Sequence, residues 1–165
     1  MHLDGFLSYP SAVYTVPYGV MVPKEVDNLL LPVPVSGSHI GFSTLRMEPC
    51  WMAMGQAAGI ASALSIDGKV KVQNINLSRL QDKLIDQKAT LMYFKDVDYT
   101  SPHFRMVQYL GLRGYLPEWT ARLQEPVDAT TLAAWKKLSG TDLPGIEAGK
   151  TTRLATLEMI YRKIK

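Results

Sequence analysis

Hydrophobic residues form short, interrupted runs in the first part of the chain and recur at helical spacing in the rest. Within residues 10–35 the runs are rich in β-branched residues and broken by prolines, which predicts short strands. The last of these runs, Leu29–Val35, is apolar throughout and contains two prolines, which favours the edge or the end of a sheet. Residues 69–75 alternate between polar and apolar and predict a further short strand or an extended segment.

The clearest helical pattern covers residues 47–66. Pro49 suits the first turn of a helix, and Asp67-Gly68 suits its end. Gly55 and Gly59 lie four residues apart, on one face with Ala58 and Ser62. A face with so few side chain atoms lets another backbone or a flat ligand approach closely.

Four more helices are predicted further along the chain. They run from Asn76 or Ser78 to about Ala89, from Pro102 to Leu112, from Ala129 to Leu138 after Asp128 as the cap, and from Thr151 onward. The whole pattern predicts an α+β fold that is mainly helical, with two or three short strands and no complete Rossmann unit. We place a boundary near Tyr93, between residues 1–93 and a helical C-terminal appendage, residues 94–165.

Composition excludes several classes of function. The net charge is +3 and no run of Lys and Arg exceeds two residues, which argues against a nucleic acid partner. One cysteine excludes an intramolecular disulfide framework and a cysteine-rich zinc site, and the three histidines are far apart, so we predict no metal site. No apolar stretch is long enough to cross a membrane. The first six residues lack the features of a signal peptide, so the compartment stays open between cytoplasm and export by a signal further upstream.

Candidate chemistry gathers around the start of the 47–66 helix. His39 lies in a loop of small polar residues after a predicted strand, where either a ligand contact or a hydrogen bond to the backbone would suit it. Arg46 and the helix N-terminus together favour an anion or an electron-rich oxygen, although a core helix packed through small residues fits the same pattern. Cys50 is either an activated thiol or a small buried hydrophobic residue.

A series of short motifs follows in one order along the first part of the chain. The series is Val16-Pro17-Tyr18, Val22-Pro23-Lys24, Val26-Asp27-Asn28-Leu29-Leu30, Ser36-x-Ser38-His39, Ser43-Thr44-Leu45-Arg46 and Cys50-x-Met52-Ala53-Met54-Gly55-Gln56-Ala57-Ala58-Gly59. It resembles the C-terminal part of bacterial FAD-dependent oxidoreductases of the glutathione-reductase-like fold, some relatives of which carry the name xanthan lyase. The resemblance implies that the complete protein transfers electrons or hydride through FAD.

The same resemblance implies which residues lie near the cofactor. It places the N-terminus of the Gly/Ala helix toward the flavin, and it assigns no catalytic residue. The implied cofactor-binding residues are Ser36, Ser38, His39, Ser43, Arg46, Cys50, Gly55, Gln56 and Gly59. Gly19 stands where many relatives have an arginine, so one basic contact to the cofactor is missing.

The chain contains no glycine-rich pyrophosphate loop and no first βαβ unit. We therefore expect a fragment of a larger protein, whose partner is the missing N-terminal FAD-binding half. By itself the fragment is expected to be inactive and to lack FAD, which the complete protein would hold. Its exposed apolar segments also predict self-association.

The C-terminal part carries different markers. Phe94-Lys95-Asp96-Val97, Gly111-x-x-Gly114-Tyr115 and Thr151-Thr152-Arg153-Leu154-Ala155 are similar to motifs of surface-layer-homology-like helical modules. The resemblance implies an alternative function, a non-catalytic module that binds a cell-surface polymer, a polysaccharide or a protein.

Overall fold

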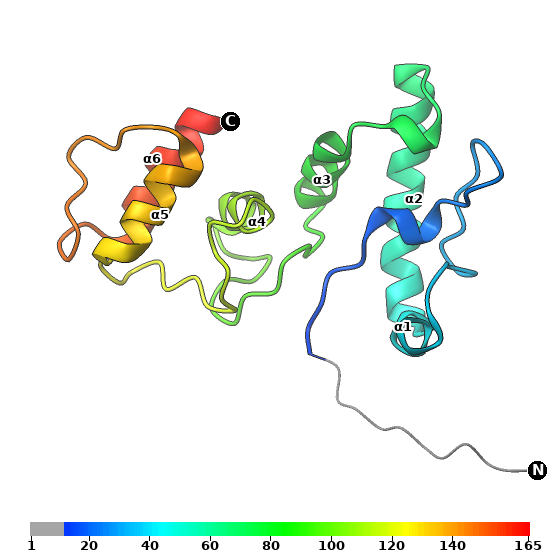
Figure 1. Cartoon of the computed structure of the whole chain (residues 1–165), viewed down its shortest axis with the longest axis horizontal. Coiled ribbons are helices and arrows are strands. Elements are labelled where there is room, and N and C mark those ends of the chain that lie inside the picture. Colours follow the sequence, from blue (N-terminus) through cyan, green and yellow to red (C-terminus); the bar gives the residue numbers. More distant parts are fainter. Residues whose placement is uncertain (1–11) are drawn as a thin grey trace, which may run out of the picture. The chain divides into compact units, whose positions relative to one another are not determined.

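The computed structural model describes residues 12–165 (Figure 1). The chain divides into two compact units, Met1–Asn76 and Leu77–Lys165, and each is described by itself. The predicted assignment of residues 1–93 and 94–165 to two different families remains a prediction.

Helices are the regular elements of the described residues. The first unit contains the 3₁₀ helix η1, Tyr18–Met21, the helices α1, His39–Leu45, and α2, Glu48–Gly68, and the 3₁₀ helix η2, Val72–Asn74. The second unit contains α3, Leu77–Asp86, α4, Phe104–Gly111, α5, Ala129–Ser139, and α6, Arg153–Ile164. The mainly helical character predicted from the sequence is thus confirmed.

The predicted short strands are wrong for residues 12–165, which contain no strand. Residues 10 and 11, at the start of the first predicted strand segment, lie outside the described residues. In place of a sheet, the chain makes single backbone hydrogen bonds, from the Leu31 amide to the Met21 carbonyl and from the Ser36 amide to the Val20 carbonyl. Prolines explain the difference, because Pro32 and Pro34 have no N–H to continue a ladder.

The alternating segment 69–75 is also not a strand. Its centre winds into η2, and the alternation buries Val72 and Ile75 while the lysines beside them stay exposed. The one bridge among the described residues is isolated and joins Pro126 to Thr152. An α+β class is therefore replaced by a helical one.

The helix predicted over 47–66 is confirmed as α2. It has proline in its first turn and ends at Lys69, which takes the left-handed conformation with φ of 49°. The predicted Asp128 cap of α5 is also confirmed, since its side chain accepts a hydrogen bond from the Thr131 amide.

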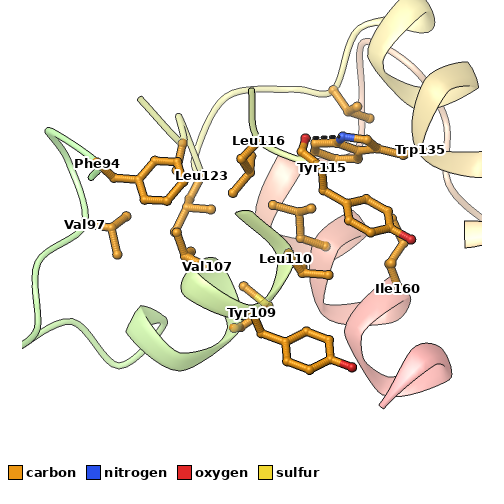
Figure 2. Close-up of a cluster of buried hydrophobic side chains, with 14 of the residues drawn as sticks. Phe94, Val97, Val107, Tyr109, Leu110, Tyr115, Leu116, Leu123, Trp135 and Ile160 are labelled. Atoms are coloured by element: carbon orange, nitrogen blue, oxygen red, sulfur yellow. Dashed lines mark hydrogen bonds between the residues drawn. The ribbon is translucent and has the colours of Figure 1, made fainter. Parts of the chain in front are cut away.

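Each unit has its own hydrophobic core. In the first unit α2 packs on residues of the preceding segments, and the buried members are Met21, Val35, Leu45, Met54 and Ala58. The core of the second unit is larger and joins α4, α5 and α6 with the connecting loops (Figure 2). There the Trp135 indole N–H donates to the Tyr115 carbonyl at 2.7 Å, which ties α5 to the loop after α4.

Candidate functional site

The leading end of α2 is open to solvent. Met47, Glu48 and Pro49 are all exposed, and Met47 keeps 52% of its accessible surface. The amides of Cys50 and Trp51 both donate to the Met47 carbonyl, at 2.9 and 3.2 Å, and Pro49 has no N–H. Most backbone donors of the first turn are therefore already used, which leaves the positive end of the helix dipole and few free N–H groups for a ligand.

The segment around His39 is a short helix and not the predicted loop. Ser38 caps α1 by accepting a hydrogen bond from the Gly41 amide at 3.1 Å, and Ser43 donates to the Ile40 carbonyl at 2.6 Å. His39 is exposed in the first turn, and Arg46 is exposed where the helix ends. The Ser38 hydroxyl, the His39 imidazole and the Arg46 guanidinium thus lie at the two ends of one short helix.

α1 lies at the N-terminal end of α2, to which it is joined by two residues (Figure 1). Leu45 anchors it, because its side chain is buried in the same core as Met54 of α2. The Cys50 thiol lies 4.0 Å from the Thr44 carbonyl oxygen, so the end of α1 contacts the start of α2. The structure therefore gathers Ser38, Ser43 and Arg46, together with His39 and Cys50, at one end of α2.

Ser36 precedes this group and is exposed, with its amide held by the Val20 carbonyl. Gly55, Gln56 and Gly59 lie elsewhere, along the side of α2. Gly59 is nine residues beyond Cys50, which corresponds to about 14 Å along a helix. The nine sequence-predicted residues thus form two groups, one at the end of α2 and one on its side.

Cys50 is half-buried. Its sulfur lies 4.0 Å from the Tyr14 hydroxyl as well as from Thr44, and Trp51 next to it packs on the core. These contacts fit the small hydrophobic residue that the sequence left open as one of two possibilities.

The sequence did not reveal the structural role of the Tyr18 hydroxyl. Its hydroxyl donates to the Val72 carbonyl at 2.9 Å, which joins η1 to η2, and partial burial raises its pKa. Asn28 makes a second contact with η2, because its side chain accepts a hydrogen bond from the Val72 amide. The Asn28 backbone takes the left-handed conformation, with φ of 57°. The Val26-Asp27-Asn28 and Pro17-Tyr18 motifs therefore hold the segment after α2 in place.

A second feature lies in the loops of the second unit and was not predicted. A pocket of about 400 Å³ is lined by Asp96, Val97, Ser101, His103, Thr120, Arg122, Leu123, Gln124 and Glu125. The Asp96 carboxylate holds its wall by accepting from the Ala121 and Arg122 amides, at 2.8 and 2.7 Å.

No group of three or more metal-ligating side chains occurs among residues 12–165. Over the same described residues, the helices are all too short or too polar to cross a bilayer.

Comparison with protein families gives a match to the first half of the chain. Residues 3–84, about half of the chain, match the family described as FAD dependent oxidoreductase. The resemblance to FAD-dependent oxidoreductases is thereby confirmed for this part of the chain, which includes α1, α2 and all nine predicted cofactor-binding residues. Comparison with curated proteins and with solved structures gives no match.

Proposed function

We propose that the first unit is the flavin-side part of an FAD-dependent oxidoreductase and that another polypeptide segment supplies most of the FAD binding. The open leading end of α2, with the polar side chains of α1 beside it, is the observation that carries this proposal. An end sealed among apolar side chains would have left no access for a ligand, whereas this end is open.

The residues at this end fit FAD in the chemistry of their side chains. FAD presents phosphate oxygens, ribityl hydroxyls and a ring edge with hydrogen-bond acceptors and donors. The exposed Ser36 and His39, with Arg46, offer matching groups. The backbone contributes less, because the amides of Cys50 and Trp51 are already bonded to Met47.

Each group has a distinct part in the proposal. Arg46 supplies a positive charge for phosphate or for an electron-rich ring edge, and His39 supplies a donor or an acceptor according to its tautomer. The α2 dipole adds a fixed positive potential at the same end. When bound, FAD itself supplies the two-electron chemistry.

Gly55 and Gly59 have a different role in the proposal, which is contact with protein and not with the cofactor. A Cβ built on either glycine meets no atom within 4 Å, so this side of α2 is open space. In the complete oxidoreductase we assign it to close contact with the FAD-binding half. The glutathione-reductase-like fold and the xanthan lyase relationship are part of the same proposal.

The chain alone is expected to hold FAD weakly and to be inactive. The phosphates of a dinucleotide are normally held by a glycine-rich loop at a helix N-terminus, and the sequence contains no such loop.

The test compares the chain alone with a longer polypeptide that includes residues encoded upstream of it. We expect visible flavin absorbance after purification for the longer polypeptide and none for the chain alone.

In the longer polypeptide, Arg46→Ala should raise the Kd for FAD roughly tenfold, because a charge-assisted hydrogen bond is lost. Lys24→Ala, which removes an exposed cation outside the candidate site, is the control. A longer polypeptide without flavin, or equal effects of the two variants, would refute the proposal.

The polysaccharide-binding alternative concerns residues 94–165, beyond the end of the family match at residue 84. Trp119 favours it, since its ring forms an exposed edge-to-face pair with Tyr93, the residue just before this region, with ring centroids 6.4 Å apart. Trp119 adjoins Thr120, which lines the pocket of the second unit together with other hydrogen-bonding residues. Aromatic faces beside hydrogen-bonding groups suit a sugar. Retention on insoluble polysaccharide that is lost in Trp119→Ala would support this function.

A further inference from the structure

One side of α2 is exposed from its first turn to its last, apart from the half-buried Gly55. The buried residues Met54, Ala58, Ala61 and Leu64 share the other side. At 100° per residue, the side directly opposite carries Met52, Gly59 and Ile66. Met52 and Ile66 are 75% and 76% exposed, more than any other large hydrophobic residue described.

This exposed side follows a regular spacing. Its residues lie alternately four and three apart, which is the seam spacing of a coiled coil. We call this set the α2 seam: Glu48, Met52, Gly55, Gly59, Ser62, Ile66 and, as the cap residue, Lys69. From Pro49 to Ile66 the helix carries no charged residue, so the charges of the seam lie only at its two ends.

We propose that the α2 seam binds the α2 seam of a second copy of this chain, antiparallel, with a two-fold axis at Gly59. In that alignment Glu48 lies opposite Lys69 of the second copy, and Met52 lies opposite its Ile66. The central glycines face each other across the axis. One surface is then used by both copies, as two-fold symmetry requires.

Charge and size both favour this occupant. The alignment brings an acidic end onto a basic end twice, by symmetry, and it sets the two helix dipoles antiparallel. The seam has small residues at its centre, so the two backbones can approach closely near Gly59. The large side chains of Met52 and Ile66, toward the ends of the seam, would then be buried against the second copy and lose their exposure to water.

The inference does not depend on FAD. In the chain as it stands the second copy covers the side of α2 that we assign, in a complete oxidoreductase, to the FAD-binding half. Dimerisation of the chain is therefore measured without cofactor, and it can succeed or fail whatever the outcome of the flavin experiment.

Sedimentation equilibrium of the full chain tests the pairing. Gly59→Glu should raise the dimer Kd about tenfold or more, because two carboxylates then meet at the axis, while open space at Gly59 lets the variant fold. Ala53→Glu is the control, since Ala53 is exposed on α2 but lies off the seam. Lys69→Glu should raise the Kd roughly threefold, and adding Glu48→Lys should restore it. A chain that stays monomeric, or equal effects of Gly59→Glu and Ala53→Glu, overturns the proposal.

Cross-linking under a mild thiol oxidant tests the direction of the pairing, in a Cys50→Ser background that removes the one native cysteine. A mixture of Met52→Cys and Ile66→Cys chains should form a disulfide between the two variants. Met52→Cys alone should not, because its two copies lie about 21 Å apart along antiparallel helices, far beyond the reach of a disulfide. Cross-linking of Met52→Cys with itself indicates a parallel pair and overturns the antiparallel proposal.

Discussion

Gln108 is the residue on which the start of the second unit depends most directly. It is fully buried in α4, and its side chain oxygen accepts from the Leu91 and Met92 amides, both at 2.8 Å. Its nitrogen donates to the Met92 carbonyl at 2.7 Å. One amide side chain thus satisfies three backbone groups of the segment that leads into the core.

Replacing Gln108 by Leu should lower the free energy of unfolding by about 1–3 kcal/mol, because two part-buried N–H groups and a carbonyl lose their partners. Urea denaturation followed by circular dichroism measures the change. Gln124→Leu is the matched control, since Gln124 is exposed and should change the free energy by less than about 0.5 kcal/mol. A similar small effect for both variants would show that the three hydrogen bonds contribute little.

At the scale of elements, glycines in two helices predict opposite effects of one substitution. Gly55→Ala in α2 should raise the free energy of unfolding by about 0.5–1 kcal/mol, because alanine favours the helix and its Cβ meets nothing within 4 Å. Gly111→Ala in α4 should lower it by about 1–2 kcal/mol, since the new Cβ would lie 3.0 Å from the buried ring of Phe94. Thermal and urea denaturation at low protein concentration measure both. Stabilisation by both variants would mean that the Phe94 ring moves aside freely.

The elements also show how much of the secondary structure the sequence predicts. α2 was predictable because its length, its proline start and its apolar run agree, and α5 because Asp128 is a strong cap. The strands were not, because Leu29–Val35 has the composition of a strand but its prolines prevent a ladder, and pairing depends on partners that composition does not reveal.

The candidate site was predictable only in part. Resemblance brought the nine residues together as one list, and the structure separates the group at the end of α2 from the group on its side. α1 escaped prediction because seven residues are too few for a clear hydrophobic period, although Ser38 at its start is a recognisable cap. The pocket around His103 could not be foreseen, since its lining comes from two loops far apart in sequence.

For the whole molecule, two separate cores predict two units of stability. The core of the second unit is built around α4, α5 and α6 and includes the fully buried Leu110, whereas the first unit depends on α2 and the segments before it. Leu110→Ala should cost about 2–5 kcal/mol through lost burial and a cavity. Because Leu110 contributes to one core only, hydrogen exchange measured by mass spectrometry should accelerate in α4, α5 and α6 while the amides of α2 keep their protection.

Ala61→Gly in α2, at a fully buried position of the first unit, should give the reverse pattern. Equal acceleration in both units for either variant would mean that the chain unfolds as one cooperative body, and the division of stability between two cores would be wrong.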